Sequence, residues 1–306
     1  MQTQIVPFSD RATESAVQLI RSGQPVAVPT ETVYGLAADA TSASAVAAIF
    51  AAKGRPAFNP LIVHVASMDQ ALAIGSFSAT ASSLADQYWP GPLTIVVPLR
   101  TDARIAADAV AGLATIAIRI PEHRVMRALL VATGLPLAAP SANASGTISP
   151  TRAEHVLRTL DGKIPMVIDD GPTTGGIEST IVKVEGSTVT LLRHGPILIE
   201  GAMEIGKGHS IEAPGQLTAH YAPSKPLRLN ALTVAGDEWH VGFGSVVGTI
   251  NLSAGGNLDE AAATLFAALH AADLSMALRI AVAPIPEIGV GLAINDRLRR
   301  AAAGAR

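Results

Sequence analysis

The sequence predicts an α/β protein with a larger N-terminal domain, a linker and a smaller C-terminal domain. Apolar runs of strand length alternate with helix-like stretches up to about residue 199. From residue 201 to residue 226, glycine, proline and histidine dominate and no apolar periodicity survives. A second alternation of strand-like and helix-like segments starts near residue 227. We therefore expect domains at residues 1–205 and 227–306, joined by a linker at residues 206–226.

The elements of the first domain follow from apolar runs bounded by turn residues. Strands are expected at residues 26–28, 61–65, 93–97, 116–120, 137–139, 166–168, 180–184 and 189–192. Helices are expected at residues 43–52, 122–132 and 153–160. Gly54 and Gly134 stand just past the first two helices as C-terminal stops, and Thr151 with Glu154 matches a capping box for the third.

In the second domain, one helical face and one strand stand out. The strand is expected at residues 279–285, and the helical face is formed by Leu258, Ala262, Leu265, Phe266 and Leu269. A stretch at residues 241–248 looks like a dinucleotide loop, but Val247 occupies the place of the third glycine, which argues against nicotinamide binding. The basic residues Arg297, Arg299 and Arg300 are expected on a solvated helix face.

Composition excludes several classes of protein. Of the 306 residues, 49% are hydrophobic and 15% charged, and the net charge of 22 − 25 = −3 argues against a large nucleic-acid footprint. There is no cysteine, which excludes disulfides, thiolate catalysis and Cys-ligated zinc. The N-terminus lacks the features of a signal peptide, and no apolar run approaches the ~18 residues of a membrane span. We expect a cytoplasmic protein without a membrane segment.

The polar segment PTETVYGL at residues 29–36 follows the first expected strand, and we expect a helix after it. Turn chemistry alone would need only its glycine or proline, yet the segment adds two threonine hydroxyls, a carboxylate and a phenol. Polar groups at the end of a buried strand are typical of ligand sites in α/β proteins. Thr32 is therefore a candidate binding residue.

Two strands carry unexpected polar residues. His64 interrupts an apolar run that follows Lys53, Arg55 and Asn59, and it can be either a core residue or a ligand-facing one. Arg119 alternates with isoleucines, on the same face as Thr115. A buried arginine needs a partner, so Arg119 binds either an anionic ligand or an internal carboxylate.

Small polar loops follow or precede other expected strands. Ser141 and Asn143 offer a hydroxyl and an amide to a ligand, and Ser149 continues that loop but also suits a helix cap. Ser179 precedes a strand, and Arg193 ends the first domain with another cation.

The linker contains His220 and Tyr221. A passive spacer has little need of these side chains, so their presence favours the interpretation of the linker as a lid.

Together these segments resemble the threonylcarbamoyl-AMP synthase family in its two-domain form. The motifs that carry the resemblance are PTETVYGL at residues 29–36, KGRP and NPLIVHV within 53–65, WPGPLT at 89–94, PSANASG at 140–146, GGIESTIV at 175–182 and PGQLTAHYAP at 214–223. The resemblance implies a YrdC-like twisted mixed sheet with helices around a concave groove, followed by a smaller Rossmann-like C-terminal α/β domain.

The resemblance also implies a reaction. L-threonine, bicarbonate and ATP give L-threonylcarbamoyladenylate and pyrophosphate, with Mg2+ accompanying ATP and no metal held directly by the protein. Downstream tRNA threonylcarbamoyl transferase proteins then use the product to modify an adenosine in tRNAs that read codons beginning with adenine. We expect weak or no direct binding of tRNA by this chain.

Site residues are likewise implied by the resemblance. The residues that surround L-threonine are Thr32, His64, Arg119, Ala139 and Ser179, and those that hold ATP are Arg55, Asn59, Thr115, Ser141, Ser149, Arg193 and Tyr221. The catalytic signature pairs Lys53 and Arg55 with Ser141 and Asn143. A carbamate oxygen that attacks the α-phosphate needs positioning and charge neutralisation rather than a strong acid or base, which suits these residue types.

Three alternatives stay open from the sequence. One is an RNA-binding module of the tRNA-modification system without its own turnover, against which the net charge of −3 argues. Another is a carbamoyl transferase that uses carbamoyl phosphate, but such proteins carry Cys-rich zinc modules and this chain has no cysteine. The third is a non-enzymatic sensor. The motifs say nothing of the oligomeric state or of the role of the C-terminal domain.

Overall fold

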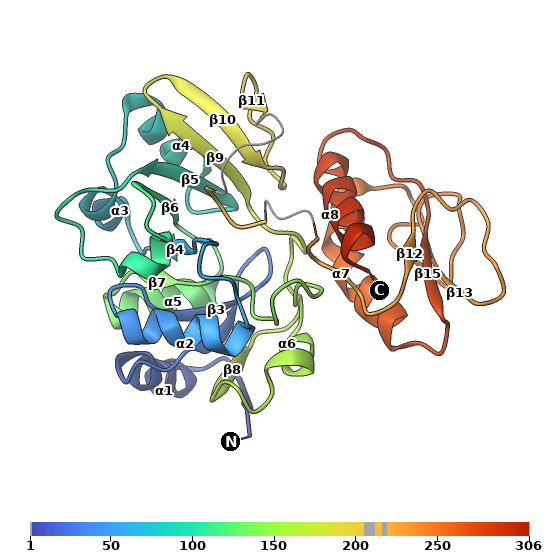
Figure 1. Ribbon diagram of the computed structural model, residues 1–306, viewed down its shortest axis with the longest axis horizontal. Helices are drawn as coiled ribbons and strands as arrows, with labels where there is room; N and C mark the ends of the chain where they lie inside the picture. The colour runs from blue at the N-terminus through green and yellow to red at the C-terminus, as the bar shows by residue number, and fades with distance from the viewer. Residues whose placement is uncertain (1, 205–211, 216–218, 306) are drawn as a thin grey trace.

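Two α/β units lie next to each other in the computed structural model, which describes residues 2–204, 212–215 and 219–305 (Figure 1). The elements of the larger unit are β1 (Gln4–Pro7), α1 (Asp10–Arg21), β2 (Val26–Pro29), β3 (Tyr34–Asp39), α2 (Ala43–Lys53), β4 (Ile62–His64), α3 (Met68–Ile74), α4 (Ala79–Tyr88), β5 (Leu93–Pro98), the 3-10 helix η1 (Ala107–Val110), β6 (Thr115–Arg119), α5 (Arg124–Thr133), β7 (Leu137–Ala138), α6 (Ala153–Leu160), β8 (Met166–Asp169), β9 (Thr180–Glu185), β10 (Thr188–Arg193) and β11 (Met203–Glu204).

Within the described residues, the larger unit forms an 11-stranded sheet in the order β1-β8-β2-β3-β7-β4-β6-β5-β9-β10-β11. The sheet is mixed, since β4 pairs with β6 in parallel and with β7 in antiparallel orientation. The parallel register places His64 beside Arg119, so the two polar residues that interrupt apolar strands are neighbours. The predicted mixed α/β fold of this domain is confirmed.

The predicted helix stops are also confirmed. Gly54 and Gly134 end α2 and α5 in the left-handed conformation, with φ of 59° and 68°. The predicted capping box is wrong, because the N-cap of α6 is Arg152 and no side chain caps this helix. The backbone N–H of Thr151 instead donates to Nδ1 of His155, 3.3 Å away.

The segment after β2 differs from the prediction of a turn and then a helix. A strand, β3, comes before α2 and pairs with β2 in antiparallel orientation, with Val28 opposite Gly35. The side chain of Thr30 closes the reversal, because its hydroxyl donates to the carbonyl of Val33 at 2.7 Å and accepts from the N–H groups of Thr32 and Val33. This compact turn holds the polar residues 30–32 at one end of the hairpin.

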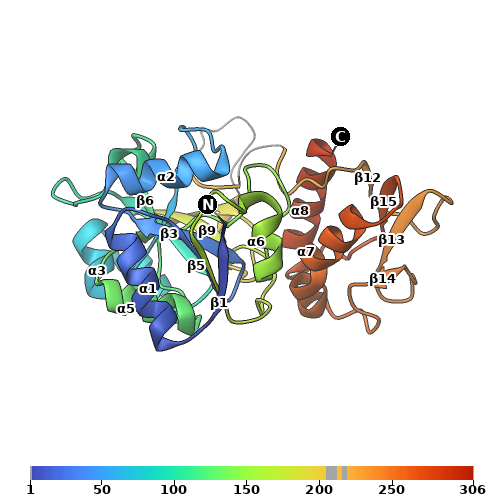
Figure 2. The same ribbon diagram turned by 90° about the horizontal axis from the view of Figure 1, so that it is seen from below.

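The smaller unit contains β12 (Leu227–Arg228), β13 (Glu238–Gly242), β14 (Ile250–Asn251), α7 (Leu258–Leu274), β15 (Arg279–Val282) and α8 (Gly291–Gly304). Its described strands form a parallel four-stranded sheet in the order β12-β15-β13-β14, which confirms the predicted Rossmann-like domain. In both ribbon views α7 and α8 lie on the side that faces the larger unit (Figures 1 and 2). The core of the smaller unit accordingly includes Val33, Ile148 and Ile177 of the larger one. The domain limits given above stay predictions, and part of the linker lies outside the described residues.

The interface between the units depends on Gly176. Its φ is +70°, and a Cβ built there would overlap the backbone of Ala262 and Ala263 in α7. We expect Gly176→Ala to lower the free energy of unfolding by about 2–4 kcal/mol, because left-handed strain and overpacking add. Urea unfolding measures the loss. Gly134→Ala is the matched control: its φ is +68° with nothing within 4 Å of the added Cβ, so only the strain remains. Equal losses in the two variants would contradict the close approach.

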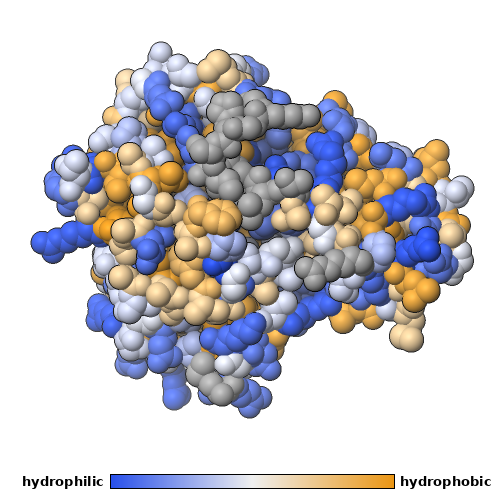
Figure 3. Space-filling model, in the orientation of Figure 1, coloured by the Kyte–Doolittle hydropathy of each residue, from blue (hydrophilic) through white to orange (hydrophobic). Residues whose placement is uncertain are grey.

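The surface mixes residue types. Figure 3 shows hydrophilic and hydrophobic residues interspersed over the face turned to the viewer. None of the helices formed by the described residues is both long and apolar enough to span a bilayer.

Candidate active site

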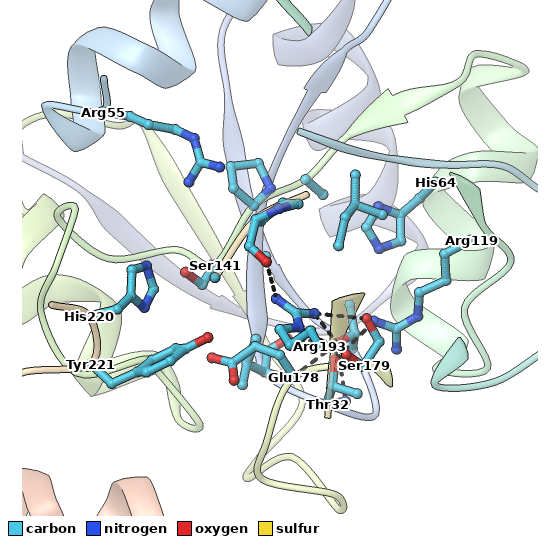
Figure 4. Close-up of a pocket in the computed structure, with 18 residues that line it drawn as sticks. Thr32, Arg55, His64, Arg119, Ser141, Glu178, Ser179, Arg193, His220 and Tyr221 are labelled. Carbon is cyan, nitrogen blue, oxygen red and sulfur yellow. Dashed lines mark hydrogen bonds between the residues drawn. The ribbon is translucent and has the colours of Figure 1, made fainter. Parts of the chain in front are cut away.

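Segments far apart in the sequence meet in a small enclosed pocket of about 50 Å³ beside the ends of β2, β4, β6 and β10 (Figure 4). The residues that line it are Thr30, Thr32, Val33, Gly35, Arg55, Ile62, His64, Arg119, Ala139, Pro140, Ser141, Glu178, Ser179, Arg193, Pro214, Gly215, His220 and Tyr221. The structure thus brings together ten of the residues singled out from the sequence: Thr32, Arg55, His64, Arg119, Ala139, Ser141, Ser179, Arg193, His220 and Tyr221.

One side of the pocket is built around Arg119. Its Nη2 pairs with Oε1 of Glu31 at 2.5 Å, its Nη1 donates to the hydroxyl of Thr32 at 3.1 Å, and its Nε donates to the carbonyl of Gly91 at 3.1 Å. The internal ion pair left open by the sequence therefore exists. A guanidinium has five N–H donors, so these three bonds leave two for a ligand.

Glu31 stays ionised beside this arginine. Burial raises the pKa of the Glu31 carboxyl, but the charge and hydrogen bond of Arg119 outweigh the burial, and the net pKa lies below its ordinary value. The pair therefore fixes the guanidinium in place without removing its remaining donors.

His64 lies beside Arg119 and is almost fully buried. Burial, reinforced by the charge of Arg119, lowers the pKa of His64 to about 3, so the imidazole is neutral at ordinary pH. Its Nδ1 is buried without a hydrogen-bond partner. A buried polar atom that lacks a partner and belongs to a pocket-lining residue is a feature typical of a ligand site. His64 therefore lines the pocket, and its contact with a ligand stays a prediction.

The opposite side of the pocket carries Arg55 and the linker residues His220 and Tyr221 (Figure 4). Arg55 donates to the carbonyls of Asn59 and Pro60 at 3.1 and 2.8 Å. Burial lowers the pKa of Arg55 to about 10, so it remains a cation at neutral pH. Nδ1 of His220 and the hydroxyl of Tyr221 are buried without partners.

Arg193 lies between the two sides, where it holds the loop before β9. It donates to the carbonyl of Ser179 at 2.9 Å and to its hydroxyl at 3.0 Å. Burial lowers the pKa of Arg193 to about 10, which leaves it charged at neutral pH. Gly215 permits the linker to approach, because a Cβ built there would lie 2.9 Å from Cδ of Arg193 and 3.0 Å from the hydroxyl of Tyr221.

Lys53 does not line the pocket. Its buried ammonium donates to the carbonyls of Ser141 and Asn143, at 2.5 and 2.6 Å. The Asn143 amide in turn donates to the carbonyls of Ala144 and Thr147. Two members of the predicted catalytic signature, Lys53 and Asn143, therefore shape the loop that presents Ser141, and their part in catalysis stays a prediction.

Three residues expected at ATP also lie outside the lining. Thr115 begins β6 opposite Pro98 at the far end of the strand from Arg119. Asn59 is buried next to Arg55, and both polar atoms of its amide lack partners. Ser149 is not a helix cap, because its hydroxyl donates to Oε1 of Glu178 at 2.5 Å.

Glu178 is the pocket residue that sequence reasoning missed as a site residue. It lies within the GGIEST segment, where only Ser179 stood out as a ligand group. Besides Ser149 it accepts from Nε of Arg297 at 2.9 Å, from the other domain. No local pattern marks a carboxylate whose partner is 119 residues away.

The described residues contain no cluster of three or more histidine, aspartate or glutamate side chains that could hold a metal ion. The carboxylate of the described lining, Glu178, is already occupied by Ser149 and Arg297. These side chains therefore do not fit a protein-held metal.

Two family models match the chain. One, described as telomere recombination, matches residues 18–195, and one described as the C-terminal domain of threonylcarbamoyl-AMP synthase matches residues 177–303. The chain is 39% identical to the threonylcarbamoyl-AMP synthase of Bacillus subtilis (strain 168), over 97% of this chain and 94% of that protein. It is 38% identical to the threonylcarbamoyl-AMP synthase of Pyrococcus abyssi, over 94% and 92% of the two chains.

Solved structures show the same relationship. The structure of P. abyssi Sua5 complexed with L-threonine matches with a TM-score of 0.89 and 35% identity, over 99% of this chain and 97% of that one. Escherichia coli YciO matches with a TM-score of 0.59 over 65% of this chain and 98% of that one, and at 19% identity this is a likeness of fold alone. The predicted YrdC-like catalytic fold with a second domain is confirmed.

Proposed function

The chain belongs to the threonylcarbamoyl-AMP synthase family of enzymes, and from this premise we propose that it forms L-threonylcarbamoyladenylate and pyrophosphate from L-threonine, bicarbonate and ATP. The observation that carries the proposal is the convergence of Arg55, Arg119 and Arg193 on one pocket whose lining residues also include unpartnered neutral groups. Such a site suits a ligand with several anionic groups and a few hydrogen-bonding ones.

We place L-threonine on the side formed by Thr32, His64 and Arg119. The two remaining guanidinium donors of Arg119 suit a carboxylate, and the neutral imidazole of His64 can accept from an amine or a hydroxyl. Ala139 and Ser179 complete this side. The P. abyssi relative was solved with L-threonine, which supports the choice of amino acid.

We place ATP on the side formed by Arg55, Ser141, Arg193 and Tyr221. Two arginines that stay charged at neutral pH can neutralise phosphates, and the Tyr221 hydroxyl lacks a partner. We propose that the linker segment with Tyr221 acts as a lid over the bound nucleotide, because His220 and Tyr221 of the linker line the pocket.

The reaction then needs little acid–base chemistry. The amine nitrogen of threonine bonds to the carbon of bicarbonate, which loses water, and the nitrogen gives up a proton to solvent, so that a carbamate forms. A carbamate oxygen then attacks the α-phosphorus of ATP, and the bond from that phosphorus to the bridging oxygen breaks as pyrophosphate leaves. The pocket aligns the two reactants and offsets charge on the phosphates with Arg55 and Arg193. Since the described residues do not fit a protein-held metal, we assign Mg2+ to the nucleotide alone.

The test is pyrophosphate release by the purified protein, with threonine and bicarbonate each present or omitted. We expect release to need both, and Arg55→Ala to lower kcat/KM for ATP by about a hundredfold, the loss typical of a charged hydrogen bond to the reacting group. Arg104→Ala, which alters a residue remote from the lining, is the control. Release that does not depend on threonine would contradict the proposed substrate and leave an adenylating enzyme with another acceptor.

Downstream use of the product by tRNA threonylcarbamoyl transferase proteins, weak or absent contact with tRNA, and a cytoplasmic location stay predictions. The RNA-binding alternative predicts retention of tRNA on a filter at low salt together with no pyrophosphate release.

A further inference from the structure

Arg297 of α8 is a buried residue of the C-terminal domain that reaches the wall of the active-site pocket. Its side chain has no solvent exposure, whereas Arg299 on the same helix is 54% exposed. Nε of Arg297 donates to Oε2 of Glu178 at 2.9 Å, and Nη1 donates to Asp296 at 2.8 Å. The expectation of a solvated helix face is therefore wrong for Arg297.

Arg297 does not itself line the pocket, but it contacts two residues that do. One is Glu178, whose other oxygen accepts from Ser149. The second is Tyr221, whose ring centroid lies 5.2 Å from Cζ of Arg297 and 5.6 Å from the ring of Phe266 in α7. Tyr221 is thus held by two helices of the C-terminal domain, with a cation on its ring.

The contact between Arg297 and Glu178 matters because Glu178 carries a negative charge. A buried carboxylate in a pocket for phosphates repels its ligand unless a cation compensates it. Burial raises the pKa of Glu178, but Arg297 and Arg193 outweigh this and keep the net pKa below its ordinary value. Arg297 thus adds a second counter-charge to Glu178 beside Arg193, whose guanidinium is held by Ser179 and Pro214.

We propose that Arg297 is a positioning residue for the nucleotide half of the active site: it serves as the counter-ion of Glu178 and the support of Tyr221. This inference rests on the proposed function. The inference gives the C-terminal domain a defined part in nucleotide binding. It predicts that loss of Arg297 weakens the affinity for ATP but not the affinity for L-threonine, because Arg297 contacts none of Thr32, His64 and Arg119.

The test measures ATP and L-threonine binding by titration calorimetry in the full chain and in Arg297→Met, which keeps length and removes the charge. We expect the Kd for ATP to rise about tenfold or more, because Glu178 is left uncompensated. The Kd for L-threonine should stay within about twofold, since its predicted residues share no partner with Arg297. Arg299→Met, on the exposed side of α8, should leave both constants unchanged.

Rescue of ATP binding by a second substitution tests whether Arg297 acts through its charge or only through packing. In Glu178→Gln combined with Arg297→Met both charges are gone, and such neutral replacement of a buried pair is often tolerated. The double variant should bind ATP at least about threefold more tightly than Arg297→Met alone. If Arg297→Met does not fold, Glu178→Gln and the double variant supply the comparison. Glu178→Gln keeps the cation against the Tyr221 ring and should bind ATP more tightly than the double variant, and equal affinities would contradict the support of Tyr221.

A double variant as weak as Arg297→Met, or a parallel rise in the Kd for threonine, overturns the inference. Failure of the proposed function is a different result. If the unaltered chain makes no adenylate from threonine while Arg297→Met still loses ATP affinity selectively, the reaction is wrong and the positioning role stands.

Discussion

Arg119→Ala is expected to lower kcat/KM for L-threonine by about a thousandfold, the larger of the activity losses predicted for this chain. Two effects act together. The substrate carboxylate loses its guanidinium partner, and Glu31 is left as a buried carboxylate whose counter-ion is gone. The hydroxyl of Thr32 also loses the donor that orients it.

Three further variants test whether the loss of activity in Arg119→Ala comes from the missing guanidinium. Arg119→Lys keeps the charge but has three N–H donors in place of five, so bonds to Glu31, Thr32 and Gly91 would leave none for the substrate, and it should recover only part of the activity. Glu31→Gln keeps the guanidinium and should cost less than the loss of Arg119. Arg104→Ala, an exposed arginine outside the described lining, is the surface control and should be neutral. An unchanged KM and Kd for threonine in Arg119→Ala would contradict the assignment of this side of the pocket.

Local patterns were sufficient to predict the strands that carry the site. His64 and Arg119 stood out because each interrupts an apolar run, and the parallel pairing of β4 and β6 places them side by side. The alternation along residues 115–120 placed Arg119 on one face with Thr115, and Arg119 lines the pocket whereas Thr115 does not. Period-two patterns suffice for this step because they depend on residues close in sequence.

Contacts between distant segments could not be predicted in the same way. Arg297 and Arg299 look alike in sequence, yet they lie on opposite sides of α8, and only the packing of the two domains shows which is buried. Lys53 was assigned to the catalytic signature by the family resemblance alone, and its partners in the structure are two carbonyls 88 and 90 residues away. The hairpin of β2 and β3 was missed because its turn is closed by the Thr30 side chain within a polar segment that was expected to lead directly into a helix.

The fold itself is expected to fail in mild acid, because four histidines are buried in their neutral form. Burial is the first cause in each case, and it lowers the pKa of His64, His220 and His270 to about 3 and that of His155 to about 4. An unfolded chain binds protons at these groups near their ordinary pKa of about 6.5. Above that pH neither state binds them, and below it only the unfolded state does, so stability falls as pH falls from about 6.5 toward about 4.

The expected loss of unfolding free energy at acid pH is large. Each such histidine contributes about 1.4 kcal/mol per pH unit once the pH is well below 6.5, so the four together reach up to about 8 kcal/mol at pH 5. A typical domain has only about 5–15 kcal/mol of stability. The ionised carboxyls Glu31 and Glu178, whose pKa values are lowered, act in the same direction at lower pH.

Part of this loss should be located at the contact between the domains. His155 of α6 stacks on His270 of α7 with ring centroids 3.9 Å apart, and Arg158 lies 2.6 Å from Nδ1 of His270. Protonation of either ring there would place cations side by side, so the two units should separate before the larger core unfolds. Urea unfolding at several pH values between about 7.5 and 5 measures the slope, and His155→Asn should lower it by about 1.4 kcal/mol per pH unit. A free energy of unfolding that is constant from about pH 6.5 to 5 would contradict neutral burial of these rings.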